Sequence, residues 1–168
     1  ILEWVKKRFS QEENGVLPYK GKNHIVICEY TAYADELIHA LRDYEKTKDI
    51  DRVVIGSLIE TRPYPDCHFI RGVPVSPDVQ IKANIEAASA IFVFVNIRFT
   101  DPDVKTLHVV SRIMRKNIHA PIYVELINPE HPLIKHLPRT IIPMKSQDIL
   151  HAILVNEGFD IQRYWKEK

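Results

Sequence analysis

Short apolar runs alternate with helical segments along most of this sequence, and this alternation restricts the possible folds more than any other feature. Six runs rich in β-branched residues are each short enough to form a strand that is buried on both faces. They are Asn23–Cys28, Arg52–Ser57, His68–Arg71, Ala90–Val95, Pro121–Leu126 and Thr140–Ile142. Strands that alternate with helices pair in parallel through right-handed crossovers. We therefore predict an α/β fold, a Rossmann-like doubly wound parallel six-stranded sheet with the strand order 3-2-1-4-5-6.

The segments between these runs carry helix signals. The predicted helices are Thr31–Tyr44, one that starts at Ser76-Pro77-Asp78, Asp101–Asn117, Pro129–Leu137 and Gln147–Asn156. Pro77 and Pro102 each follow a capping side chain and precede a carboxylate, which is the usual order at a helix start. Two prolines, Pro63 and Pro65, argue against a full helix between the second and third strands.

The first 22 residues differ from the rest of the chain. Ile1–Ser10 combines apolar residues with a basic cluster after Trp4, as the cytoplasmic end of a membrane helix does, although an ordinary amphipathic helix fits equally well. Gln11–Lys22 is polar and contains turn residues, which predicts a linker. Because the chain begins with Ile1, we expect a fragment of a longer polypeptide. The predicted division is a helix tail and linker at 1–22, one domain at 23–158 and a C-terminal tail at 159–168.

Composition argues against several classes of function. A chain of 168 residues that is 45% hydrophobic can bury the core of one domain. Its formal net charge is +1, so we expect no nucleic-acid partner. Cys28 and Cys67 form no C-x-x-C motif, which fits a reducing compartment. We therefore expect a cytosolic location, and, because no apolar run is long enough to cross a bilayer, a soluble chain.

Several stretches resemble the RCK (regulator of potassium conductance) and potassium-transport nucleotide-binding (KTN, TrkA-N-like) family. They are N-H-I-V-I-C at Asn23–Cys28, F-I-R-G-V-P at Phe69–Pro74, the following S-P-D-V-Q-I-K-A-N-I-E-A-A-S-A-I-F-V, and I-Y-V-E at Ile122–Glu125. The resemblance covers about residues 23 to 158. It implies a cytoplasmic gating domain of an inner-membrane potassium channel or transporter, with a transmembrane pore domain upstream. We expect no enzyme, because the chain has neither a G-x-S-x-G motif nor a Walker glycine loop.

The resemblance places a ligand cleft at the carboxyl ends of the strands. The candidate cofactor-binding residues are Glu29, Tyr30, Thr31, Ala32, Ser57, Leu58, Asn96 and Arg98. Nucleotide-binding members carry glycines after the first strand, and here Glu29 stands at the first of these positions. A carboxylate there would satisfy the helix dipole and repel a phosphate by about 1 kcal/mol or more. The cofactor therefore stays open between a nucleotide and a divalent cation. The alternatives are an NAD(P)-binding oxidoreductase or dinucleotide sensor, and an assembly scaffold without a ligand.

Calcium-gated members of the family use an aspartate in the turn after the third strand and acidic residues on the fifth. Here Val73 and Ile127 take two of these positions and only Glu125 remains, so that calcium site lacks ligands. Glu29 and Glu125 both lie at carboxyl ends of strands, which makes them candidate ligands for a different cation. The eight histidines show no metal-ligand spacing.

The Asp101–Asn117 helix has apolar residues on more than one side, which suggests a partner subunit, although burial within the same chain would also explain them. In the resembled family this helix and the next two build dimers and larger rings. The predicted interface residues are Val104, Leu107, Val110, Ser111, Met114, Leu133, Ile149, Leu150, Ile153 and Leu154. We expect a homo-oligomer, either a dimer or a ring of four or eight subunits.

Overall fold

The structure is a computed structural model that describes residues 1–117, 119–145 and 147. Its strands are β1 (Ile25–Cys28), β2 (Arg52–Gly56), β3 (Cys67–Arg71), β4 (Ala90–Val93), β5 (Ile122–Glu125) and β6 (Ile141–Met144). Its helices are α1 (Leu2–Glu13), α2 (Ala32–Asp43), α3 (Pro77–Lys82) and α4 (Pro102–Lys116), with 3-10 turns η1 (Ile85–Ala87) and η2 (Pro132–His136). The predicted helix Gln147–Asn156, apart from Gln147, and the tail at 159–168 lie outside the described residues.

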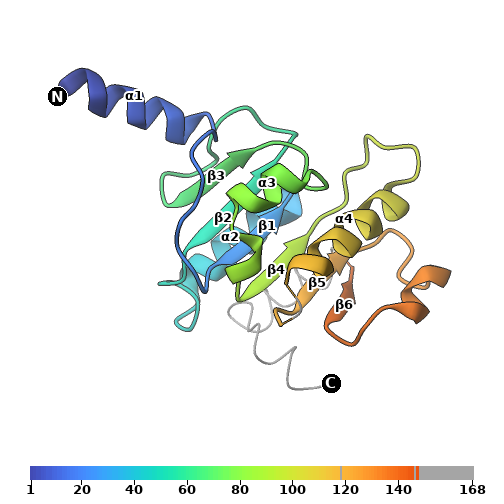
Figure 1. Cartoon of the computed structure of the whole chain (residues 1–168). Helices are drawn as coiled ribbons and strands as arrows, with labels where there is room; N and C mark the ends of the chain where they lie inside the picture. The colour runs from blue at the N-terminus through green and yellow to red at the C-terminus, as the bar shows by residue number, and fades with distance from the viewer. Residues whose placement is uncertain (118, 146, 148–168) are drawn as a thin grey trace.

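The six strands form one parallel sheet in the order β3-β2-β1-β4-β5-β6, which confirms the predicted topology. Alternate side chains of the central strand β1 point to opposite faces. Ile25 and Ile27 pack with α2, whereas Val26 and Cys28 pack with α4. Figure 1 shows the result, with α3 and α4 covering one face of the sheet and α2 the other. Strands buried on both faces explain why the apolar runs are continuous.

Several predicted boundaries were wrong by a few residues. β4 ends at Val93 rather than Val95, and β6 extends to Met144 through Pro143. A proline is tolerated there because, among the described residues, β6 is an edge strand, which leaves one side of its backbone without a ladder partner. The predicted helix Pro129–Leu137 is the 3-10 turn η2, and Ser76 precedes α3 without a side-chain capping bond. The connection from β2 to β3 has no helix, as predicted.

Residues 14–22, predicted as a linker, are attached to the domain. The predicted linker began at Gln11, but its first three residues belong to α1, which ends at Glu13. The backbone N–H of Arg71 donates to the Gly15 carbonyl at 3.0 Å, and the N–H of Tyr19 donates to the Lys82 carbonyl at 2.8 Å. Gly15 has φ +69°, and a Cβ there would lie 2.5 Å from the Arg71 nitrogen, so only glycine fits. The segment is therefore fixed beside β3 and α3.

The α1 helix extends away from the sheet beyond β3 (Figure 1). It buries no residue, and Leu2, Trp4, Val5 and Phe9 are exposed on it. Within the part of the chain that the structure describes, no helix has the length and apolar character that a membrane span requires.

We expect His24 to make the fold less stable in acid. The ring is fully buried and its Nε2–H donates to the Ala83 carbonyl at 2.9 Å. Burial lowers the pKa of His24, with a smaller lowering from His68, against opposing effects of the Ala83 bond and Asp51. Between this pKa and the ordinary value of about 6.5, the unfolded chain binds more protons than the folded chain, so the free energy of unfolding falls as the pH drops through that window.

Urea denaturation at about pH 7.5 and pH 5.5 measures this loss. The variant His24→Gln keeps a donor for the Ala83 carbonyl but does not titrate, so the difference between the two pH values should be smaller. An equal pH dependence in the variant would show that His24 is not its source.

Candidate functional site at the carboxyl edge of the sheet

Glu29 joins three strands at the carboxyl edge of the sheet. It follows β1 directly, and β1 lies between β2 and β4. Its carboxylate accepts hydrogen bonds from the backbone N–H of Ser57 at 2.8 Å and from the Asn96 Nδ2 at 2.7 Å. The Ser57 hydroxyl lies 2.9 Å from both carboxylate oxygens. Glu29 is only 4% exposed, so this carboxylate is buried and its charge is stabilised by neighbouring donors.

This carboxylate lies where doubly wound folds bind phosphate, in the crevice outside the first strand and near the amino end of the following helix. The backbone of Glu29 has φ +71°, a left-handed conformation that normally favours glycine. A non-glycine residue there costs about 1–2 kcal/mol, which the hydrogen bonds to Ser57 and Asn96 offset. We call Glu29, Ser57 and Asn96 the carboxylate clasp.

The other predicted cofactor residues do not join the clasp. Thr31 caps α2 by accepting from the Ala34 N–H at 3.3 Å, and Ala32 begins that helix. Leu58 is half-buried beyond β2, and Arg98 is exposed, with its backbone N–H donating to the Asn96 Oδ1 at 3.0 Å. The prediction thus gathered three residues that meet and several that only flank them.

Tyr30 turns away from the clasp toward a second polar cluster on α2. Its hydroxyl and that of Tyr64 both donate to the Asp35 carboxylate. Burial and then the bond to Asp35 raise the pKa of Tyr30. Burial opposes ionisation of Asp35, but the two phenol bonds together with the charges of His39 and Arg42 hold the pKa of Asp35 below its usual range. These three groups therefore bond to one another rather than to the clasp.

The two candidate metal ligands are not assembled into a cation site. Glu29 is engaged by the clasp, and Glu125 is a buried residue at the end of β5, which is separated from β1 by β4. Among the described residues, no group of three or more His, Cys, Asp or Glu side chains is placed to hold a metal ion.

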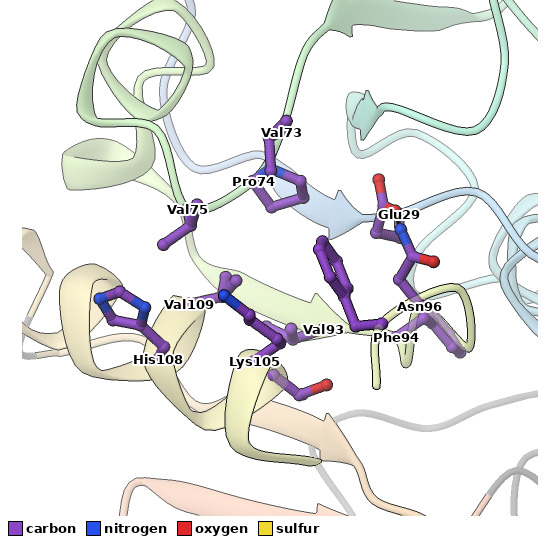
Figure 2. A pocket seen from close by; sticks show the side chains of 12 residues that line it. Glu29, Val73, Pro74, Val75, Val93, Phe94, Asn96, Lys105, His108 and Val109 are labelled. Atoms are coloured by element: carbon purple, nitrogen blue, oxygen red, sulfur yellow. Dashed lines mark hydrogen bonds between the residues drawn. The ribbon is translucent and has the colours of Figure 1, made fainter. Parts of the chain in front are cut away.

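A cavity of about 290 Å³ lies beside the clasp, on the α4 side of the sheet (Figure 2). Its walls are almost entirely apolar, and they come from the loop before α3, the end of β4 and α4. Glu29 and Asn96 lie at one side of it, and Lys105 and His108 of α4 at another. The sequence gives no signal for this cavity, because its valine walls carry no motif.

The predicted interface residues fall into three groups. Leu107 and Val110 are buried in the core beneath α4, so they are not available to a partner and the burial alternative holds for them. Val104 is 41% exposed and Leu133 is 49% exposed, whereas Ser111 and Met114 are half-buried. Ile149, Leu150, Ile153 and Leu154 lie outside the described residues.

Comparison with known proteins gives a match in fold. No family model matches the sequence, and no curated protein matches it. The TrkA-N domain of inner membrane protein ybaL from Escherichia coli matches with a TM-score of 0.60 and 17% identity over 81% of this chain and 97% of that one. The structure of GsuK bound to ADP matches with a TM-score of 0.64 and 17% identity, over 84% of this chain and 36% of that one. The human SLO3 gating ring matches with a TM-score of 0.56 and 21% identity, over 80% of this chain and 31% of that one.

These matches define the class: the chain has the fold of an RCK or TrkA-N-like domain. It spans only 30% of the length of the GsuK RCK domain structure.

Proposed function

We propose that this chain is the cytoplasmic regulatory domain of a potassium channel or transporter, that it self-associates, and that it transmits conformational changes to a membrane pore through α1. The fold supports this proposal, because it is the fold of the GsuK RCK domain and of the human SLO3 gating ring. We propose no catalytic activity, in keeping with the absence of a catalytic motif from the sequence.

The observation that carries the proposal is a continuous connection from the clasp to α1. Ser57, a donor to Glu29, begins the loop that leads from β2 to Arg62. The Arg62 side chain is only 10% exposed, and it donates to the Glu13 carboxylate at 3.1 Å and lies 3.8 Å from that of Glu12. Its backbone N–H donates to the Glu13 carbonyl at 2.8 Å. We propose that a shift of the clasp is transmitted along this loop and through Arg62 to α1.

Self-association is supported by exposed apolar residues near the carboxyl edge. They are Ile97, Phe99, Val104, Ile127 and Leu133, which belong to the segments after β4 and β5 and to α4 and η2. We propose that these residues belong to one patch that a second copy covers, because contiguous apolar exposure marks protein contacts.

Replacement of Val104 by aspartate is expected to shift the chain toward the monomer, because a charge buried in an apolar interface is costly. Sedimentation equilibrium of the wild-type chain should show a dimer or a larger assembly, and Val104→Asp should weaken it by about tenfold or more. Val16→Asp is the matched control, since Val16 is also exposed but lies in the segment beside β3, away from α4. A monomeric wild-type chain, or equal weakening by both variants, would contradict the proposed association.

The carboxylate clasp argues against the alternative of a dinucleotide sensor or oxidoreductase. Isothermal titration of this chain with NAD, NADH, ADP and ATP should show no binding, because Glu29 already takes the donors that a phosphate would use. Saturable binding of any of them at the carboxyl edge would favour the alternative.

A further inference from the structure

The cavity beside the clasp has the shape and lining of a small-molecule site. Val73, Pro74 and Val75 form one wall, Val93 of β4 forms the floor, and Val109 of α4 forms the opposite wall. Figure 2 shows these side chains surrounding a common space. At about 290 Å³ the cavity is at the lower end of the range for ligand pockets, and apolar walls with a few polar groups at the rim are typical of them.

The polar groups at the rim are unequal. On one side Asn96 and Glu29 are bound to each other, and the Glu29 carboxylate is saturated by the clasp. On the α4 side, the Lys105 ammonium lies 5.4 Å from the centre of the Phe99 ring and has no ion pair with any described residue. His108 lines the same side. The cavity thus has a positive side and, across from it, a buried negative charge that repels anions.

This arrangement selects for one class of ligand. An apolar body would replace water against the valines, and a single negative charge would pair with Lys105. A second negative charge would approach Glu29, and a cation would meet Lys105, so both are disfavoured.

We propose that this cavity binds a small amphipathic monocarboxylate, an apolar body with one carboxylate, which lies between α4 and residues 73–75 with its carboxylate on Lys105. The regulatory role of such a ligand rests on the proposed function, but its binding does not. The two ideas therefore fail separately: absence of binding overturns this proposal alone, and binding without any effect on ion flux would count against the proposed function.

Isothermal titration of the whole chain with octanoate, octan-1-ol and octylamine tests the proposal with three probes that share an apolar chain and differ in charge. Octanoate should bind saturably with one site, and octylamine should bind at least about tenfold more weakly, as expected for a charge-assisted contact. Equal affinity for all three probes, or no binding of octanoate, would overturn the proposal.

Two variants test whether the probe binds in this cavity. Lys105→Glu should lower the affinity for octanoate by at least about tenfold and raise the affinity for octylamine. Val73 is exposed at the mouth of the cavity, so Val73→Trp should fill the mouth and lower the affinity for both probes. Lys22→Glu is the control, because it reverses the same charge ahead of β1, at the amino edge of the sheet. Unchanged octanoate affinity in Lys105→Glu, or an equal loss in Lys22→Glu, would overturn the site. Octanoate affinity that falls as the chain self-associates would assign the cavity to a second copy instead.

Discussion

Replacement of Glu29 by glutamine is expected to lower the free energy of unfolding by about 2–4 kcal/mol, the larger of the stability effects that we predict. The carboxylate accepts from the Ser57 N–H and the Asn96 amide at distances below 3 Å, and it is almost fully buried. A glutamine amide presents a donor to one of these donors, which leaves buried polar groups unsatisfied. Urea denaturation monitored by circular dichroism measures the change.

Glu86→Gln is the matched control for this experiment. Glu86 is exposed in the turn η1, so the same chemical change there should alter the free energy of unfolding by less than about 0.5 kcal/mol. If Glu29→Gln is as stable as Glu86→Gln, the clasp does not hold the three strand ends together, and the path from the clasp to α1 loses its origin.

Replacement of Arg62 by alanine is expected to release α1 from the domain while the sheet stays folded. The guanidinium pairs with Glu13 and Glu12 and lies 5.6 Å from the centre of the Phe9 ring, and α1 has no buried residue of its own. Loss of these contacts should make amide hydrogen exchange in α1 faster by about tenfold, which corresponds to the free energy contributed by one hydrogen bond to a charged group. Exchange in β1 should not change.

Arg71→Ala provides the comparison for Arg62. Arg71 pairs at 3.7 Å with Glu60, and both side chains are exposed, so this pair contributes little. Exchange in α1 should stay at its wild-type rate in that variant. The proposed connection would be contradicted if Arg62→Ala also left the exchange of α1 unchanged.

The sheet was predictable from the sequence because its strands are buried on both faces. Runs such as Ile25–Cys28 have no polar residue, and strands of this kind occur in parallel sheets covered by helices. Glu29 was predictable for a similar reason, because the residue after the first strand of such a sheet always lies at the ligand crevice.

The attachment of residues 14–22 was not predictable, because most of it depends on backbone groups. Gly15 and Tyr19 bind Arg71 and Lys82 through main-chain atoms, which any residue type supplies. The polar composition of the segment therefore resembled that of a free linker. Only Gly15, with its left-handed backbone, gave a signal, and glycine is equally common in flexible linkers.

The breadth of the apolar surface of α4 was also misleading. Leu107 and Val110 were predicted to face a partner, but the helix packs against β4, β5 and η1, so more of its circumference is covered than a single stripe would be. A sequence does not distinguish a helix that is buried in a wide groove from one that is buried by another subunit. Val104 is exposed at the start of α4, so its replacement tests whether another subunit covers this helix.

Potassium flux through the complete gene product, reconstituted in liposomes, tests the proposed regulatory role most directly. The wild-type protein should conduct potassium, and Arg62→Ala should change the open fraction by severalfold while Arg71→Ala leaves it unaltered, because the Arg62 side chain pairs with Glu13 of α1 whereas the Arg71 side chain pairs with Glu60. A protein that conducts no potassium, or one whose flux is the same with and without Arg62, would contradict the account.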